Sequence, residues 1–110
     1  MKYVVEATKT MFGEEAYKVV NKQLESKEDW IYEVNILGLV PNENGDIITP
    51  FFEFLDKNFN SAQVERESIV DSKLSRFSGI SVIKVKFIEF NEANGYAAML
   101  NTKLKSEESK

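Results

Sequence analysis

The sequence predicts an α+β fold, a two-layer sandwich in which about five mostly antiparallel strands carry two helices on one face. Three observations lead to this prediction. Stretches with alternating apolar residues, typical of strands, are interspersed with stretches whose apolar residues recur every three or four positions, as in helices. Asn-Gly pairs at 44–45 and 94–95 supply turn residues between apolar stretches. The chain has 110 residues, of which 43% are hydrophobic, and this length fits one domain.

The first half of the chain alternates between the two periodicities. The expected elements are a strand over 2–8, a helix over 12–24, and strands over 30–40 and 47–57 joined by a turn at 41–46. Phe12 and Tyr17 are spaced to pack across the start of the helix as a hydrophobic staple. Pro50 cannot donate a ladder hydrogen bond, so the strand that contains it is expected to be an edge strand or to be bulged.

The second half repeats the plan. The expected elements are a helix from 60 or 61 to 77, strands over 80–90 and 96–104, and a polar tail over 105–110. Residues 1–104 therefore form one domain. Strand, Phe-led helix, strand and Asn-Gly turn occur in both halves, which indicates either a degenerate duplication or convergence on common turn chemistry. A doubled β-α-β plan suggests a ferredoxin-like βαββαβ sandwich with an added strand, although Pro50 argues against the standard version.

Composition excludes several classes of chemistry. The chain has no Cys and no His, which removes disulfides, thiolate or imidazole metal sites, and catalysis by either side chain. It also has no Gly-rich phosphate loop and no G-x-S-x-G or S-x-x-K motif. The oxygen-rich loop at 42–46 has the wrong spacing for a Ca²⁺ loop and is better explained as a turn. We therefore expect a non-enzymatic protein and assign no catalytic, cofactor-binding or metal-binding residue.

Charge and hydropathy bound the location and the partners. The net charge is −4, which disfavours a dedicated duplex-DNA binder. No apolar run has the ~20 residues of a membrane span, and the first residues do not resemble a signal peptide. The expected location is cytoplasmic, without a membrane partner.

The predicted outer sheet face carries apolar residues where solvent-facing residues would be polar. Such residues indicate that something covers the face, either a protein partner or a second copy of the chain. A bulge that switches the faces of the strand is the other explanation. The candidate partner-binding residues are Ile80, Val82, Ile88, Phe90 and Met99.

Lysines on the same predicted face suggest an alternative function. In the expected register Lys84 lies opposite Lys103, a like-charge pair that would suit an anion or a single-stranded nucleic acid. The candidate anion-binding residues are Lys84, Lys86, Lys103 and Lys105. Lysines that keep an edge strand in solution are the plainer explanation.

One stretch carries a resemblance to other proteins. Asn44-Gly45, Ile48-Thr49, a Phe-rich segment, Phe59 and Ala62 together resemble small uncharacterised phage-type proteins of Bacteroidetes. The resemblance covers about a third of the chain, and this chain departs from the pattern in its single-strand start and its shortness. It implies a phage or mobile-element origin, hence a host cytoplasm, and no known activity. The sequence as a whole predicts a small protein-interaction domain, with anion or single-stranded nucleic-acid binding as the alternative.

Overall fold

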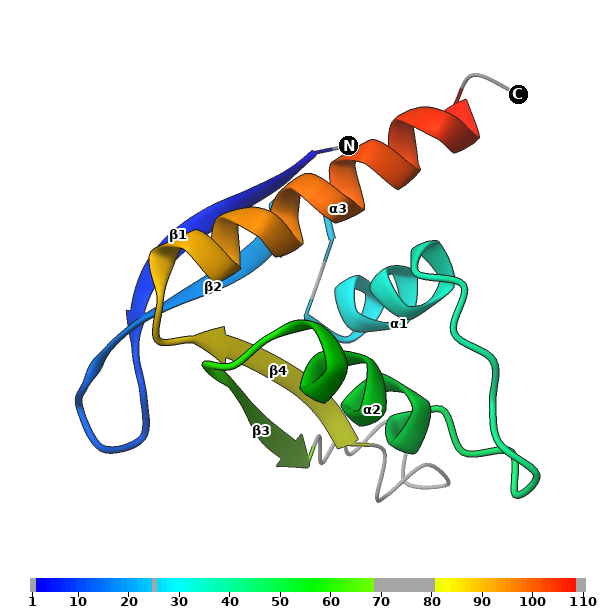
Figure 1. The fold of residues 1–110 in the computed structure, drawn as a ribbon, viewed down its shortest axis with the longest axis horizontal. Coiled ribbons are helices and arrows are strands. Elements are labelled where there is room, and N and C mark those ends of the chain that lie inside the picture. The colour runs from blue at the N-terminus through cyan, green and yellow to red at the C-terminus, as the bar shows by residue number, and fades with distance from the viewer. Residues whose placement is uncertain (1, 25, 69–80, 109–110) are drawn as a thin grey trace, which may run out of the picture.

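A computed structural model describes residues 2–24, 26–68 and 81–108 of the chain (Figure 1). The elements follow in the order β1 (Tyr3–Lys9), β2 (Glu15–Asn21), α1 (Ser26–Ile36), α2 (Ile48–Asn58), β3 (Ala62–Ser68), β4 (Ser81–Phe87) and α3 (Phe90–Glu108). The α+β class is confirmed. The described residues hold four strands and three helices, however, and not five strands and two helices. Their order also differs from the βαββαβ plan of a ferredoxin-like fold.

The sheet is antiparallel throughout, with the strand order β1-β2-β4-β3. β1 and β2 pair along their whole length, from Tyr3 opposite Asn21 to Lys9 opposite Glu15. β3 and β4 do the same. The two ribbons meet only at Tyr17–Phe87 and Lys18–Lys86, and they diverge from this junction. α3 packs along β1 and β2, while α1 packs against β4 (Figure 1).

Residues 15–21 form a strand where the sequence predicts part of a helix over 12–24. Val19 lies opposite Val5 and Tyr17 opposite Ala7 on the helix-covered face of the sheet. Gly13, with φ 81°, adopts the left-handed conformation that the β1–β2 turn requires. Val19 and Val20 are β-branched residues that favour strands, and pairing with β1 decides the outcome.

Residues 26–36 form helix α1 where a strand over 30–40 is predicted. Trp30, Val34 and Leu37 are buried at helical spacing. The helix ends at Ile36, and Gly38, two residues further on, has φ 70°. Gly38 N donates to Asn35 O at 3.1 Å and Leu39 N donates to Val34 O at 3.2 Å, which is a Schellman motif. The glycine after the last buried residue is the signal that marks this helix end.

Residues 48–58 form helix α2, so the predicted strand over 47–57 is also wrong. The Asp46 carboxylate accepts hydrogen bonds from Ile48 N at 2.8 Å and Thr49 N at 3.3 Å, as a capping side chain does. Pro50 stands in the first turn, where a residue without an N–H is tolerated. Phe51 and Leu55, one turn apart, are buried.

In the second half of the chain one predicted strand is confirmed, and two other predicted elements are wrong. β4 lies within the strand predicted over 80–90, just as β1 matches the one predicted over 2–8. Residues 62–68 form strand β3, where a helix is predicted, and the rest of that predicted helix lies outside the described residues. Residues 90–108 form helix α3 in place of the predicted loop, strand and tail. The buried side chains of α3 recur at helical spacing: Ala93, Tyr96, Ala97, Leu100 and Leu104.

The core lies between the sheet and the helices and is rich in aromatic rings. Phe51 and Phe87 are fully buried, and Tyr96 is 1% exposed. Phe59 follows α2 and packs edge-on against Phe87 at 5.1 Å and Tyr96 at 5.7 Å between ring centroids. These edge-to-face contacts tie α2, β4 and α3 together.

Candidate functional site

The predicted partner-binding residues do not share a sheet face. Phe90 begins α3, is 52% exposed, and packs edge-on against Tyr17 with 5.3 Å between centroids. Met99 also lies on α3, partly buried against the core, and Ile88 is partly buried before the helix. Val82 lies in β4, and Ile80 lies outside the described residues. The correction follows from α3, because the strand that was expected to carry Met99 is a helix.

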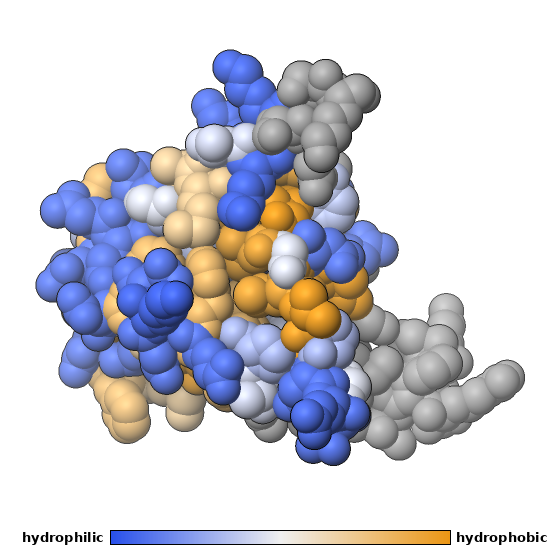
Figure 2. Space-filling view, turned by 45° about the vertical axis from the view of Figure 1, so that its right-hand side comes forward, coloured by the Kyte–Doolittle hydropathy of each residue, from blue (hydrophilic) through white to orange (hydrophobic). Residues whose placement is uncertain are grey.

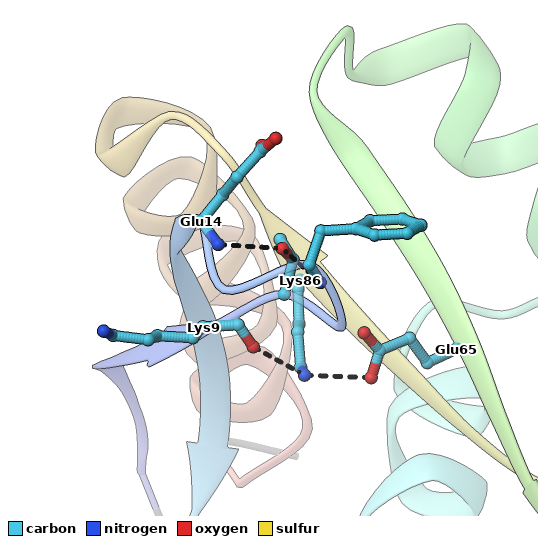
Figure 3. Close-up of polar contacts among 6 residues, drawn as sticks. Lys9, Glu14, Glu65 and Lys86 are labelled. Atoms are coloured by element: carbon cyan, nitrogen blue, oxygen red, sulfur yellow. Dashed lines mark hydrogen bonds and ion pairs between the residues drawn. The ribbon is translucent and has the colours of Figure 1, made fainter.

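The predicted anion-binding lysines separate into two groups. Lys84 and Lys86 lie on the outer face of β4, away from Phe87, as predicted. Lys103 and Lys105 lie on α3 and do not oppose them. Lys86 Nζ lies 2.9 Å from a carboxylate oxygen of Glu65 and donates to the backbone oxygen of Lys9 at 2.9 Å (Figure 3). Much of the positive charge of Lys86 is therefore compensated within the chain.

Among the residues that the structure describes, the most exposed large apolar side chains lie at the tip of the β1–β2 hairpin. We define the hairpin tip as residues 10–14. Within it Met11 is 80% exposed and Phe12 is 86% exposed. Thr10 is buried, and its Oγ1 accepts hydrogen bonds from Phe12 N and Glu14 N, both at 3.2 Å. Gly13 N donates to Thr10 O at 3.0 Å. These bonds fix the turn with both apolar side chains in solvent.

A second apolar area lies on the side of the molecule that carries α1 and α2. Figure 2 shows apolar side chains at the centre of this face, with polar side chains around them. Val40, in the loop after α1, is 73% exposed, and Ile31 on α1 is 44% exposed. Leu39, Ile47 and Ile48 are partly buried and pack against the core.

A cavity of about 270 Å³ opens where β2 and β4 diverge. The ladder between these strands ends at Lys18 and Lys86, so the facing backbones of 19–20 and 83–85 are not joined by ladder hydrogen bonds. α1 closes the inner side with Asp29, Trp30 and Glu33. The remaining walls come from the other elements: Thr8, Lys18, Val19, Val20, Ile83 to Phe87, and Tyr96.

Polar atoms without hydrogen-bond partners gather in and beside this cavity. The buried atoms in question are Tyr3 Oη, Asn21 Nδ2, Asp29 Oδ1, Trp30 Nε1 and Tyr96 Oη, none of which has a hydrogen bond of good geometry. The Tyr96 hydroxyl interacts with the Glu33 carboxyl and the Tyr3 hydroxyl with Asp29 and Asn21, so Trp30 Nε1 is the atom of this set that has neither kind of contact. Asp29, Trp30 and Tyr96 line the cavity directly. The other carboxylate oxygen of Asp29 accepts from Asn21 N at 3.3 Å, at the strand edge that β4 leaves open. Because a buried polar atom without a partner costs free energy, this cluster calls for an explanation.

Burial raises the pKa values of the two carboxyl groups that line the cavity, those of Glu33 and Asp29. Glu33 is 8% exposed, and burial raises its pKa well above the ordinary value, with a further contribution from the Asp29 carboxylate one turn away. Burial also raises the pKa of Asp29, against the effect of the hydrogen bond from Asn21. The pKa values of the Tyr3 and Tyr96 hydroxyls are raised by burial and by these carboxyl groups.

The described ranges contain no group of three or more His, Cys, Asp or Glu side chains that could hold a metal ion. No helix within the same ranges is long and apolar enough to cross a membrane. Comparison with protein-family models, curated proteins and solved structures finds no match to this chain.

Sequence reasoning missed both the hairpin tip and the cavity. Phe12 is predicted to be the hydrophobic staple of a helix, although Thr10 and Gly13 flank it as turn residues would. In the strand predicted over 30–40, Glu33 is expected on the face opposite Trp30. Its spacing of four residues from Asp29 is the signal for a shared helix face. No local signal brings that face to Tyr96, because this contact depends on how α1 and α3 pack.

Proposed function

We propose that the protein is a non-enzymatic protein-interaction domain that inserts its hairpin tip into an apolar recess on a partner protein. The observation that carries the proposal is the exposure of two adjacent large apolar side chains, Met11 at 80% and Phe12 at 86%. Burying such a side chain contributes about 1.5–3 kcal/mol, so a structured loop that leaves two of them in water is suited to a contact.

The conformation of the turn favours binding. Thr10 Oγ1 accepts from two backbone N–H groups of the tip, and Gly13 takes the one left-handed conformation in it. A tip that is already ordered loses little conformational entropy when it docks. Met11 adds an adaptable side chain next to the rigid ring of Phe12.

The charges next to the tip indicate the chemistry of the partner. Glu14 is the last residue of the hairpin tip and Glu15 follows it, and the chain has a net charge of −4. An apolar recess with a basic rim is therefore the complementary surface. The same acidic residues disfavour insertion into an anionic lipid surface.

Binding of an anion or a single-stranded nucleic acid has less support. Of the candidate lysines, Lys86 is engaged by Glu65 and Lys9, and Lys103 and Lys105 lie on a different element from Lys84. A phage or mobile-element origin and a cytoplasmic location stay predictions of the sequence.

Site-specific photo-crosslinking tests the proposal. A photoreactive phenylalanine analogue replaces Phe12 in one sample and exposed Asn94 on α3 in a control, and both are illuminated in extract of the source cells. We expect one discrete adduct from position 12 and none from 94. Excess unlabelled wild-type protein should abolish it, and excess Met11→Ser/Phe12→Ser protein should not. Equal competition by both proteins would contradict the proposal.

Light scattering over a wide concentration range separates a foreign partner from a second copy of the chain. If the partner is foreign, the purified protein stays monomeric. If the recess lies on a second copy, the mass rises with concentration in the wild type and not in the Met11→Ser/Phe12→Ser variant. A rise in mass that is identical in the two proteins would show that the tip does not mediate self-association.

A further inference from the structure

We infer that the cavity between β2 and β4 binds a small neutral molecule that carries a carbonyl oxygen on a compact apolar body. The site is separate from the hairpin tip, so the inference does not depend on the proposed function. Three features of the cavity carry it: a buried indole N–H that lacks an acceptor, carboxyl groups that are already engaged, and apolar walls.

The indole N–H of Trp30 is the polar group that asks for a ligand. Trp30 lines the cavity and is 9% exposed, and its Nε1–H has no acceptor among the residues that the structure describes. The ring packs edge-on against the fully buried Phe51, with 5.9 Å between centroids, and this contact holds the indole in place. A buried donor without a partner costs free energy, which an oxygen brought into the cavity would recover.

The carboxyl groups on the same wall are engaged by other groups. The Glu33 carboxyl interacts with the Tyr96 hydroxyl. Asp29 accepts from Asn21 N at 3.3 Å and interacts with the Tyr3 hydroxyl. A ligand group that only accepts, such as a carbonyl oxygen, therefore fits this wall better than a hydroxyl or an amine, whose hydrogen would need an acceptor of its own.

The charges around the cavity favour a neutral ligand. An ammonium group cannot accept from the indole. An anion could accept, but it would lie beside the carboxyl groups of Asp29 and Glu33. Lys84 and Lys86 also line the cavity, but Lys86 is bound by Glu65 and Lys84 has a partner too, so these two lysines do not offset the carboxyl groups.

The remaining walls suit a compact apolar body. The ladder between β2 and β4 ends before Val19 and Val85, which would form its next pair, and these two residues line the cavity instead. Ile83 and Phe87 extend the apolar wall along β4. The cavity volume is about 270 Å³, whereas an apolar cavity of about 150 Å³ is enough for benzene. A cyclic ketone therefore has the size and the chemistry that the cavity requires.

Trp30 provides the readout, because it is the only tryptophan and its indole N–H gives a single side-chain signal of its kind in the proton–nitrogen NMR spectrum. The full-length protein is titrated with cyclopentanone, cyclohexanone and cyclooctanone, which increase in size. We expect a saturable downfield shift of the indole proton with at least one of them, since a hydrogen bond to a carbonyl oxygen deshields the proton. Cyclohexylamine and cyclohexanecarboxylate, the charged probes, should give no saturable shift.

Trp30→Phe separates the hydrogen bond from simple filling of the cavity. Each ketone is compared with the hydrocarbon in which a methylene group replaces the carbonyl oxygen, and binding is followed through the relaxation of the ligand signals, which does not need the indole. Loss of the N–H should weaken ketone binding about threefold to tenfold relative to the hydrocarbon.

Val85→Phe connects the indole shift to the cavity. The larger side chain fills space between β2 and β4 and should abolish the shift. Val40→Phe makes the same change on the exposed loop after α1, where Val40 is 73% exposed, and should bind as the wild type does. Circular dichroism establishes that each variant is folded before titration.

Four results would overturn the inference: no saturable indole shift with any of the three ketones, an equal shift with either charged probe, a Trp30→Phe protein that weakens ketone and hydrocarbon alike, or an undiminished shift in folded Val85→Phe. Because the hairpin tip is intact in every variant, a failure here leaves the crosslinking from position 12 unaffected.

Discussion

Asn101 on α3 uses its side-chain amide as a strand partner for Tyr3. Its Oδ1 accepts from Tyr3 N at 2.8 Å and its Nδ2 donates to Tyr3 O at 3.0 Å. The two residues are 98 positions apart in the chain. Tyr3 begins the edge strand β1, so Asn101 satisfies backbone groups that would otherwise be open to pairing with another chain. The contact therefore joins the two ends of the fold.

Replacing Asn101 should destabilise the protein because both backbone groups of Tyr3 lose their partner. We expect Asn101→Ala to lower the free energy of unfolding by about 1–3 kcal/mol. Asn101→Asp keeps an acceptor and loses the donor, so its effect should be intermediate. Urea unfolding measures both, with Lys103→Ala on the exposed side of α3 as the control. An Asn101→Ala midpoint equal to that of the control would show that the contact does not stabilise the fold.

Two glycines should respond to alanine with opposite signs. Gly38 has φ 70°, which an alanine adopts only with strain, so Gly38→Ala should cost about 1 kcal/mol. Gly95 lies inside α3, beyond its first turn, and a Cβ added there meets no atom within 4 Å. Gly95→Ala should therefore stabilise the protein by up to ~1 kcal/mol. Melting temperatures of the two variants test the helical assignment of 90–108, because a turn at Asn94-Gly95 would reverse the second sign.

Stability should depend on pH through Glu33. Burial raises the pKa of Glu33 in the folded state above its ordinary value of 4.5, so the unfolded chain loses its proton first. The folded protein therefore loses stability as the pH rises from 4.5 toward the raised pKa, by about 1.4 kcal/mol for each unit of difference. Glu33→Gln removes this penalty.

We expect Glu33→Gln to be more stable than the wild type at pH near 8, with the difference shrinking toward pH 4 as the wild-type carboxyl stays protonated in both states. Urea midpoints across this pH range provide the measurement. Glu53→Gln, at an exposed position, controls for a change in net charge. A constant difference between Glu33→Gln and the wild type at every pH would contradict the prediction.

The hairpin tip should contribute to binding and not to stability. Met11 and Phe12 are 80% and 86% exposed, so Met11→Ser/Phe12→Ser removes few contacts within the chain. The free energy of unfolding should change by less than about 0.5 kcal/mol. A large loss of stability by thermal denaturation would mean that these side chains pack against the protein itself, which would remove the basis for a docking role.

Lys86 should matter for stability more than an exposed lysine does. The side chains of Lys86 and Glu65 are 16% and 17% exposed, and Lys86 also binds the backbone oxygen of Lys9. Lys86→Met leaves both acceptors without this partner and should cost about 1–3 kcal/mol. Lys57→Met on the exposed side of α2 should be near neutral. Equal unfolding midpoints for the two variants would indicate a solvated Lys86, as the anion-binding alternative requires.

The sequence by itself determined the chemistry that this protein lacks and some of its local structure. Without Cys or His, no thiol or imidazole chemistry is open to it whatever the fold. The alternating residues that predict a strand over 2–8 and another over 80–90 correspond to β1 and β4. These strands could be predicted because Tyr3, Val5 and Ala7 in the first and Ile83, Val85 and Phe87 in the second recur at a period of two.

Only the tertiary structure decided the identity of the other elements and the position of both candidate sites. In 15–21 and 26–36 the apolar residues fit either period, and intrinsic propensities are too small to choose between them. Residues 15–21 form a strand because Val19 pairs with Val5. Residues 26–36 form a helix because this conformation buries Trp30 and Val34 together. The cavity depends on the short β2–β4 ladder, and on helices that bring Glu33 and Tyr96 to it. Such contacts join residues far apart in the chain, and they form only when the layers pack.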